Sequence, residues 1–356
     1  MKPDLPDNNQ NNHGITHDRA PLLDAFSRPL RDLRVSVTDR CNFRCRYCMP
    51  KDAFDRDHPF LSHDELLRFE EIDRLARIFV RLGVKKIRLT GGEPLLRRHV
   101  ENLVALLSRH PIDLTLTTNA SILAKKAKAL RDAGLNRLTV SLDAMDDATF
   151  RMMNDVDFPL ASVLSGIEAA SAAGFSSIKI NTVVKKGLNE HAVLPIVEHF
   201  RGTKHIVRFI EFMDVGQTNG WRMDDVVSAD SLVRMINERY PIEPVSPDYR
   251  GEVARRWRFK DGRGEIGIIA SVTAPFCQDC TRMRLSTNGM LFSCLFSGGG
   301  FDARALLRGD TAVDDEKIEA MLVALWHQRN DQYSVLRAQK KAVLPAQKIE
   351  MSYIGG

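Results

Sequence analysis

The chain has 356 residues, of which 44% are hydrophobic and 27% charged, and its formal net charge at pH 7 is +5. This length allows a barrel-sized domain plus a smaller unit, and the small charge permits an anionic ligand without pointing to nucleic acid. No apolar run reaches the roughly 18 residues that cross a bilayer, and the polar amino terminus lacks the apolar stretch of a signal peptide. We therefore expect a globular cytoplasmic protein, where six cysteines more often bind metal than form disulfides.

The first segment, residues 1–28, is rich in Asn, Asp, Pro and His and has no hydrophobic periodicity, so we expect it to lack order. Beyond it, short β-rich runs alternate with helical patterns. The predicted strands are Leu33–Val37, Lys86–Leu89, Asp113–Thr117, Arg137–Leu142, Ser177–Val183 and His205–Phe212. The predicted helices are Asp64–Arg81, with a capping box of Ser62 and Glu65, then Val100–Arg109, Ile122–Ala133, Leu160–Ala173 and His191–Phe200.

Six such strand–helix units in series predict a parallel sheet with helices outside it. The expected fold class is α/β: a partial (β/α)6 TIM-type barrel over residues 29–245, followed by a smaller C-terminal region, 246–356, that carries the last three cysteines and the Gly-Gly tail. Parallel barrels carry their chemistry at the carboxyl ends of the strands. Several polar runs fall at such ends here, among them Gly91–Pro94, Thr117–Asn119, Ser141–Asp143 and the segment from Glu211 to Asp214.

Three cysteines, Cys41, Cys45 and Cys48, follow the first strand at C-x3-C-x2-C spacing. Three thiolates can hold three corners of a cubic iron–sulfur cluster and leave the fourth iron open to a small molecule. A cluster that only passes electrons normally takes four protein ligands, as does a structural zinc ion. No fourth cysteine and no histidine completes this loop, so the spacing indicates a cluster with one open iron.

The run Gly91-Gly92-Glu93-Pro94 follows the second strand, next to the cysteine loop. Glycine lets a ligand approach the main chain closely, and the Glu93 carboxylate could accept hydrogen bonds from an ammonium group. A tight strand-to-helix turn without a ligand is the plainer alternative. The neighbouring cysteines favour a binding site.

A second group, Cys277, Cys280 and Cys294, again offers three thiolates without an evident fourth. A zinc knuckle completed by a distant residue such as His327 is one interpretation and an iron–sulfur cluster is the other. Zinc sites of this type commonly show two cysteine pairs, and one pair is missing. The spacing alone leaves both interpretations open.

Basic residues accompany both groups. Arg282 and Arg284 would share one face of a strand and suit a phosphate, although an isolated pair of this kind is usually a solvated edge. Four more basic residues lie within strand runs, where a charged side chain is unexpected: Arg34, Lys86, Arg88 and Arg208. They could bind the same anion, or their charged ends could extend to water. The final Gly355-Gly356 could enter a site, but physical expectation alone favours a frayed end.

Taken together, Cys41–Cys48 with Tyr47 and the Gly91–Pro94 run resemble the radical S-adenosylmethionine (SAM) superfamily. The second cysteine group, Arg282-Met283-Arg284 and the final glycines narrow the resemblance to the GTP cyclases that begin molybdenum cofactor biosynthesis. It extends from about Leu30 to Gly356. The resemblance implies two [4Fe-4S] clusters and conversion of GTP, through a 5′-deoxyadenosyl radical, to (8S)-3′,8-cyclo-7,8-dihydroguanosine 5′-triphosphate.

The resemblance also implies roles for individual residues. The six cysteines would bind the two clusters, and Gly355 and Gly356 would reach the catalytic centre. SAM would be contacted by Tyr47, Gly92, Glu93, Ser141 and Met213. GTP would be contacted by Arg34, Lys86, Arg88, Thr117, Lys179, Arg208, Arg282 and Arg284.

Further expectations concern partners. The resemblance implies an electron donor of the flavodoxin or ferredoxin type and the next enzyme of the pathway, cyclic pyranopterin monophosphate synthase, with no nucleic acid or membrane. The sequence leaves the oligomeric state open, with a homodimer as one option. Two positions depart from the family pattern: Ala120 replaces the usual glycine, and the stretch before Lys179 is one residue longer.

Two other functions remain as alternatives. A peptide-modifying radical SAM enzyme would usually carry more C-terminal cysteines and lack the terminal glycines. A non-enzymatic iron–sulfur or zinc protein would need neither Gly91–Pro94 nor basic residues within the strands. Metal analysis separates the last case, because two clusters imply about eight irons per chain and zinc only one or two ions.

Overall fold

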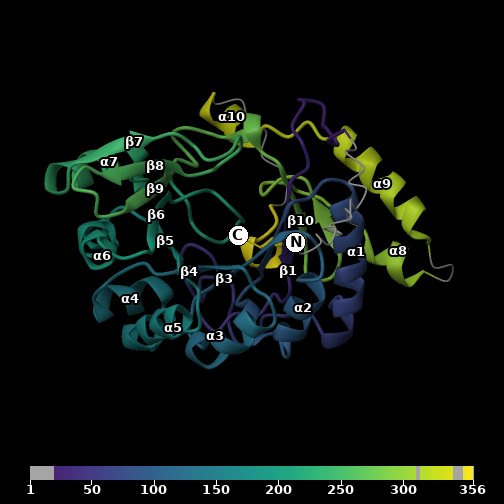
Figure 1. The fold of residues 1–356 in the computed structure, drawn as a ribbon, viewed down its shortest axis with the longest axis horizontal. Helices are drawn as coiled ribbons and strands as arrows, with labels where there is room; N and C mark the ends of the chain where they lie inside the picture. Colours follow the sequence, from purple (N-terminus) through teal and green to yellow (C-terminus); the bar gives the residue numbers. More distant parts are fainter. Residues whose placement is uncertain (1–19, 310–312, 340–347, 356) are drawn as a thin grey trace, which may run out of the picture.

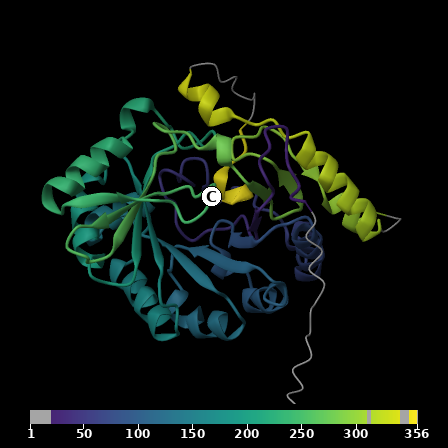
Figure 2. The ribbon, with the colours of Figure 1, turned by 45° about the horizontal axis from the view of Figure 1, so that its top comes forward.

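The computed structural model describes residues 20–309, 313–339 and 348–355. Its centre is one 12-stranded sheet with the order β12-β11-β10-β1-β2-β3-β4-β5-β6-β9-β8-β7. The run from β10 to β9 is parallel throughout, and the sheet curves into an open barrel around its concave face (Figures 1 and 2). The strands are β1 Asp32–Ser36, β2 Lys86–Thr90, β3 Asp113–Thr118, β4 Arg137–Ser141, β5 Lys179–Val184, β6 Ile206–Glu211, β7 Ile242–Val245, β8 Arg255–Phe259, β9 Glu265–Ile269, β10 Arg282–Leu285, β11 Met290–Phe292 and β12 Phe301–Asp302.

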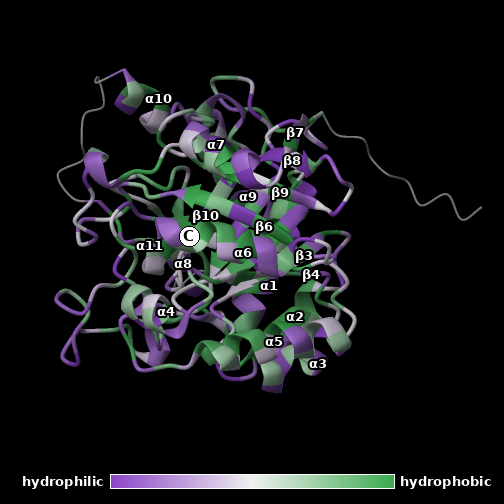
Figure 3. Ribbon diagram, turned by 90° about the vertical axis from the view of Figure 1, so that its left-hand side faces the viewer, coloured by the Kyte–Doolittle hydropathy of each residue, from purple (hydrophilic) through white to green (hydrophobic). Residues whose placement is uncertain are grey.

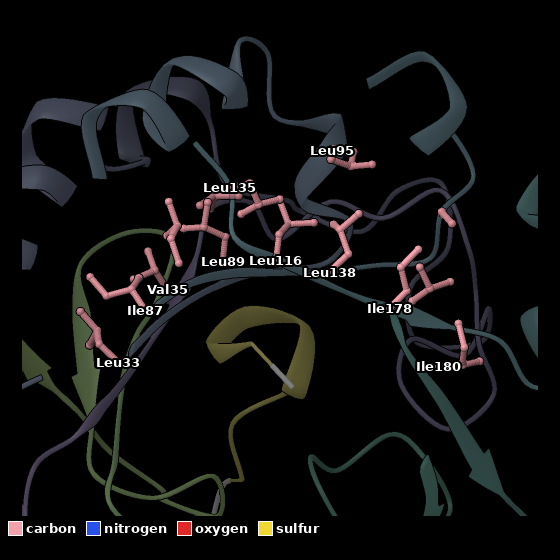
Figure 4. Packing of buried hydrophobic residues seen from close by; sticks show 14 of the residues in the cluster. Leu33, Val35, Ile87, Leu89, Leu95, Leu116, Leu135, Leu138, Ile178 and Ile180 are labelled. Atoms are coloured by element: carbon pink, nitrogen blue, oxygen red, sulfur yellow. The ribbon is translucent and has the colours of Figure 1, made fainter. Parts of the chain in front are cut away.

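Helices α1 to α7 cover the convex face of the sheet, as the α/β prediction requires (Figure 1). Their apolar sides and the outward side chains of the strands form one core, part of which Figure 4 shows between β1–β5 and the helical layer. The helices are α1 Phe69–Arg81, α2 Val100–Leu107, α3 Leu123–Asp132, α4 Asp147–Asn154, α5 Leu160–Ala172, α6 Val193–Phe200, α7 Ala229–Arg239, α8 Arg304–Arg308, α9 Asp315–His327, α10 Tyr333–Ala338 and α11 Met351–Ile354.

Helix α1 shows why these segments fold as they do. Leu75, Ile78 and Phe79 recur at helical spacing and are completely buried, whereas the opposite side is polar. Burying each such side chain contributes about 1.5–3 kcal/mol, which offsets a large part of the entropy cost of ordering the helix, about 1–2 kcal/mol per residue. The green and purple sides of the outer helices in Figure 3 follow the same division.

The six predicted strands are all present, with ends shifted by no more than two residues. The predicted helix Asp64–Arg81 is shorter than expected: the Ser62–Glu65 capping box closes only a single 3-10 turn, His63–Glu65, and α1 begins after a second capping box of Arg68 and Glu71. Helix α4 was missed. It is a short helix whose N-cap Asp146 accepts a hydrogen bond from the Thr149 backbone N–H.

The amino-terminal prediction needs a correction for residues 20–28. The expected absence of order covered 1–28, and residues 1–19 lie outside the described part. Residues 20–28, however, pack against the C-terminal half of the chain, with Arg28 1% exposed and Leu23 bridged to Pro29. Burial of a charged side chain by partners almost 300 positions away leaves no local trace in the sequence.

The C-terminal segment extends the barrel sheet. Strands β7, β8 and β9 continue beyond β6, while β10, β11 and β12 continue beyond β1. The predicted boundary at residue 245 therefore falls within one continuous sheet. The last helix, α11, lies within the opening of the barrel (the yellow turn at the centre of Figure 2).

Candidate active site

A cavity of about 600 Å³ fills the concave side of the barrel, and all six cysteines line it. The two groups approach it from opposite ends of the strands. Cys41, Cys45 and Cys48 follow the carboxyl end of β1, whereas Cys280 precedes the amino end of β10, which runs parallel to β1. The site thus extends along the barrel axis. The rule that chemistry lies at the carboxyl ends of the strands had predicted a site at one rim only.

The first cysteine group is held by its own loop. The Cys48 and Met49 N–H groups both donate to the Cys45 carbonyl at 2.9 Å, and the Phe43 N–H points at Cys41 Sγ at 3.4 Å. Burial and Glu93 raise the pKa of Cys41 to about 12. Burial also raises the pKa values of Cys45 and Cys48, which face each other's sulfur and that of Cys41.

These thiols fit an iron–sulfur cluster. A buried thiol becomes a thiolate only beside a strong cationic partner, and a metal centre is such a partner. Among the residues described, no group of three Cys, His, Asp or Glu side chains could hold one metal ion. The six cysteines are free, so both triplets can face a larger group in the cavity.

The Gly91–Pro94 turn packs directly on the cysteine loop. The N–H groups of Gly92 and Glu93 donate to the carbonyls of Thr38 and Arg40 at 2.7 and 2.8 Å. A Cβ on Gly92 would lie 2.3 Å from the Arg40 oxygen, so no larger residue fits. The glycines therefore have a structural reason, close loop-to-loop packing, in addition to the expected approach of a ligand.

Glu93 is buried at the centre of this end. Its carboxylate accepts hydrogen bonds from Thr118 Oγ1 and the Asn119 N–H, both at 2.7 Å, and from the Leu95 N–H at 3.0 Å. Burial nevertheless raises the pKa of Glu93 to about 7. A carboxylate can accept about four hydrogen bonds, which leaves room for one more donor from the cavity.

Tyr47 is oriented by Asp143, which follows β4. The Tyr47 hydroxyl donates to Asp143 Oδ2 at 2.8 Å, and the other carboxylate oxygen accepts from the Val183 N–H at 2.9 Å. Ser141 at the end of β4 and Met213 after β6 line the same part of the cavity. The five residues expected to contact SAM are thus gathered around the first cysteine group.

The second cysteine group has a different electrostatic environment. Burial alone would raise the pKa of Cys280, but Arg282 and Arg329 outweigh it and lower that pKa to about 6. Arg282 Nη2 lies 3.6 Å from Cys280 Sγ. His327, considered as a zinc ligand, is not among the cavity-lining residues and donates from Nδ1 to the Leu23 carbonyl at 2.7 Å.

Basic side chains line the cavity between the two groups. Arg88 Nη1 donates to Thr117 and Thr139 hydroxyls at 3.0 Å, and Arg208 Nε donates to Asn181 at 2.9 Å. Burial and mutual repulsion lower the pKa values of several of these cations. A bound polyanion would offset this repulsion. The lowered pKa is about 8 for Lys179 and about 9 for Arg208 and Arg284. All eight residues expected to contact GTP line this cavity: Arg34, Lys86, Arg88, Thr117, Lys179, Arg208, Arg282 and Arg284.

The C-terminal tail enters the barrel, so the expectation of a frayed end was wrong as far as residue 355. Ile354 is fully buried, the Gly355 carbonyl accepts from Arg284 Nη1, and the Tyr353 hydroxyl donates to Asn288 at 2.5 Å. Gly355 has φ +75°, and a Cβ there would lie 1.9 Å from Thr90 Oγ1. Gly356 lies outside the described residues.

Three cavity residues were not singled out from the sequence. Arg137 begins β4 and could have been found by the same signal as Arg34, a charge within a strand. Asp143 fell within a predicted strand-end run but received no role. Arg329 follows α9 with no local pattern, and only the tertiary fold brings it to the second cysteine group.

Comparison with known families agrees with this arrangement. Residues 35–200 match the model of the radical SAM superfamily, and residues 205–335 match that of Molybdenum Cofactor Synthesis C. Among solved structures, Streptococcus suis SuiB bound to S-adenosylmethionine has a TM-score of 0.58 at 16% identity, over 88% of this chain and 68% of that one. This likeness concerns the fold. The match to the superfamily model is what assigns the chain to the radical SAM class.

Closer relatives define the family within that class. The GTP 3′,8-cyclase of Acidothermus cellulolyticus is 50% identical over 94% of this chain and 99% of its own length. That of Xanthomonas axonopodis pv. citri is 49% identical over 95% and 99%. The chain belongs to the GTP 3′,8-cyclase family.

Proposed function

We propose that the chain converts GTP to 3′,8-cyclo-7,8-dihydro-GTP, the first step of molybdenum cofactor biosynthesis, with SAM as the radical source. One observation carries the proposal: a single cavity is lined by both cysteine triplets and by the basic residues between them. An electron carrier would have no need for an enclosed polyanion site, and a zinc knuckle would not share a cavity with a second triplet.

The end of the cavity at the carboxyl ends of the strands, beside Cys41, Cys45 and Cys48, suits SAM. The cluster held by Cys41, Cys45 and Cys48 would supply the electron that splits SAM into methionine and a 5′-deoxyadenosyl radical. Glu93 has one acceptor position left for the ammonium group of SAM, and Tyr47, fixed by Asp143, offers an aromatic face. Gly92, Ser141 and Met213 complete the proposed SAM contacts.

The opposite end of the cavity, at the amino ends of the strands and beside Cys277, Cys280 and Cys294, suits GTP. Arg34 is paired with Arg284 in the register of β1 and β10, and Arg282 lies two residues before Arg284 on the same strand, so the three guanidinium groups can act on one phosphate chain. Arg284 also holds the Gly355 carbonyl, which supports a role of the tail beside the substrate. Cys277, Cys280 and Cys294 would hold a second [4Fe-4S] cluster, which would supply an open iron for the guanine base.

The chemistry requires both substrates in one enclosed space. The 5′-deoxyadenosyl radical takes the hydrogen atom from C3′ of the ribose, and the C3′ radical forms a bond to C8 of guanine. One further electron and one proton complete the dihydro product, so the full change consumes two electrons and one proton. The walls of the barrel hold the reacting atoms in line and exclude water and oxygen.

The test uses protein reconstituted with iron and sulfide under strict anaerobiosis, then supplied with dithionite, SAM and GTP. We expect 5′-deoxyadenosine to form much faster with GTP than without it, and deuterium at C3′ of GTP to appear in 5′-deoxyadenosine. Cleavage of SAM that is indifferent to GTP, or equal turnover with ATP, would overturn the substrate assignment.

The proposal extends to partners and setting. An electron donor of the flavodoxin or ferredoxin type would replace dithionite, and the product would pass to cyclic pyranopterin monophosphate synthase. Reduced thiols for two clusters suit the cytoplasm. Within the described residues no helix is long and apolar enough to cross a membrane.

A further inference from the structure

Asp24, Arg28 and Arg329 form a buried cluster of charges behind the second cysteine group. Arg28 Nε and Arg329 Nη1 both approach Asp24 Oδ2, at 2.6 and 3.1 Å. The side chain of Asp24 is fully buried, and those of Arg28 and Arg329 are 1% exposed. Asp331 Oδ2 also lies 3.3 Å from Arg329 Nε, so the two guanidinium groups face two carboxylates, and their remaining buried N–H groups are costly unless acceptors compensate them.

The compensating acceptors are main-chain carbonyls of the cysteine segments. Arg28 Nη1 donates to the Cys277 carbonyl, and Arg329 Nη1 donates to the Cys280 carbonyl, both at 2.8 Å. Arg329 Nε donates at 3.1 Å to the carbonyl of Ser293, the residue before Cys294. The cluster therefore touches the backbone of every segment that supplies a thiol.

Trp326 contacts both arginines, Arg28 through its main chain and Arg329 through its guanidinium group. Trp326, in α9 and completely buried, donates from Nε1 to the Arg28 carbonyl at 3.1 Å, and the Arg329 guanidinium lies 4.6 Å from the indole centroid. Arg28 Nη1 also donates to the Asp331 carbonyl at 2.8 Å. The hydrogen-bond donors are thus held in place before any ligand arrives.

We propose that Asp24, Arg28 and Arg329 are positioning residues for the second cluster, setting the backbone of Cys277, Cys280 and Ser293 so that three thiolates converge. This inference rests on the proposed second cluster. Residues that orient metal ligands from behind typically change metal affinity by about 10- to 100-fold when they are replaced. The role also explains why residues 20–28 fold back onto the C-terminal half instead of remaining free.

Arg28 gives the sharpest test because it does not line the cavity and so does not touch GTP or SAM. In Arg28→Met, we expect reconstituted protein to hold about four irons instead of about eight. The electron paramagnetic resonance signal of the first cluster should persist, and that of the second should be lost. Arg28→Lys, which keeps the charge and one donor, should restore the second signal in part, with iron lost to a chelator roughly tenfold faster than in the unchanged protein.

The control is Arg74→Met. Arg74 binds the other side of α9 through Asp315 at 2.8 Å, remote from the cysteines, and this variant should keep both signals. Equal melting temperatures for Arg28→Met and Arg74→Met, with only the former losing the second signal, would support positioning. If Arg28→Met keeps both signals and about eight irons, the positioning role is overturned. If Arg28→Met does not fold, an unchanged rate of iron release from Arg28→Lys overturns the positioning role instead. An unchanged protein with only one cluster would instead refute the proposed function.

Discussion

The two cysteine groups line the same cavity but differ in the charged side chains beside them. Around the first, burial and the carboxylates Glu93, Asp143 and Glu350 raise the thiol pKa values. Around the second, Arg282 and Arg329 lower the pKa of Cys280, whereas burial and Asp331 raise the pKa of Cys294 to about 12. The first end therefore favours a cationic ligand, such as the ammonium and sulfonium of SAM, and the second favours a polyanion such as GTP. The charged side chains of one cavity thus favour a different substrate at each end.

Removing one thiol at each end should have the largest effect and should separate the two ends. We expect Cys48→Ala to lower 5′-deoxyadenosine formation by about a thousandfold or more, because no group in the chain replaces the chemistry of a cofactor. Cys294→Ala should retain SAM cleavage while losing the cyclic product. Iron content and chromatography of both products provide the measurement. Identical losses in both variants would mean that the two ends do not work separately.

The basic end can be tested by removing one guanidinium. For Arg284→Ala we expect kcat/KM for GTP to fall by about 10- to 150-fold, since a hydrogen bond to a charged group contributes about 1.5–3 kcal/mol. The Kd for SAM should stay unchanged. Arg308→Ala provides a matched control, because Arg308 pairs with Glu71 on the outside of the barrel. Loss of the first cluster's spectrum in Arg284→Ala would show a structural role instead.

The tail links the two ends, and Gly355→Ala tests that link. The new Cβ would overlap Thr90 Oγ1, and φ at this position is in the left-handed region, so we expect the tail to leave its seat and product formation to fall about tenfold. SAM binding should change little. Gly299→Ala, where a Cβ would meet no neighbour within 4 Å, should have full activity. Full activity of Gly355→Ala would favour a tail without function.

The acidic end should respond to pH through Glu93. Burial raises the pKa of Glu93 from 4.5 to about 7, so its carboxylate becomes protonated as the pH falls from 8 to 6. We expect the Kd for SAM to rise several-fold, by less than roughly tenfold, over that range, because one unit of pKa corresponds to about 1.4 kcal/mol. Glu93→Gln should abolish this dependence, as titration calorimetry can show. A Kd for SAM that rises equally in Glu93→Gln would assign the effect to another group.

The same shift affects stability with a definite sign. Because the folded pKa of Glu93 is above its unfolded value, the folded state binds the proton more tightly. Its contribution to the free energy of unfolding is therefore present below about pH 4.5 and is lost as the pH rises through about 7. Comparing chemical denaturation of Glu93→Gln with the unchanged protein at both pH values isolates this contribution.

The smallest effect is expected at Ala120, beside the first cysteine group. Ala120 has φ +59° and is completely buried. In Ala120→Gly, relief of left-handed strain, about 1–2 kcal/mol, opposes the loss of a buried methyl group, about 0.8 kcal/mol, and the added backbone entropy, about 0.5–1 kcal/mol. We expect the free energy of unfolding to change by less than about 1 kcal/mol, with activity unaffected. Urea denaturation measures it, and a loss above about 2 kcal/mol would show that the methyl group supports the loop of Asn119.

The fold and much of the site were predictable because their signals are local. Each parallel strand is a short apolar run that ends in unusual polar residues, and the cysteine spacings need no tertiary information. Long-range contacts left no such trace. Nothing near Arg28 indicates that Asp24 and Arg329 enclose it, and the pairing of β10 with β1 depends on a register set by packing. The tail was misjudged for the same reason: two glycines indicate flexibility until their neighbours are known.

The pairing of β1 with β10 also determines when the site can form. Thr281 and Asp32, which share a hydrogen bond, are 249 positions apart, and closing so long a loop carries a large entropic cost. The first cysteine loop, by contrast, is bonded to segments that follow it within about 110 residues, namely the Gly91–Pro94 turn, Asp143 and the end of α4. We expect the SAM end to take shape early during synthesis and the GTP end only after the chain returns to β1. Cluster insertion would then follow the same order along the barrel.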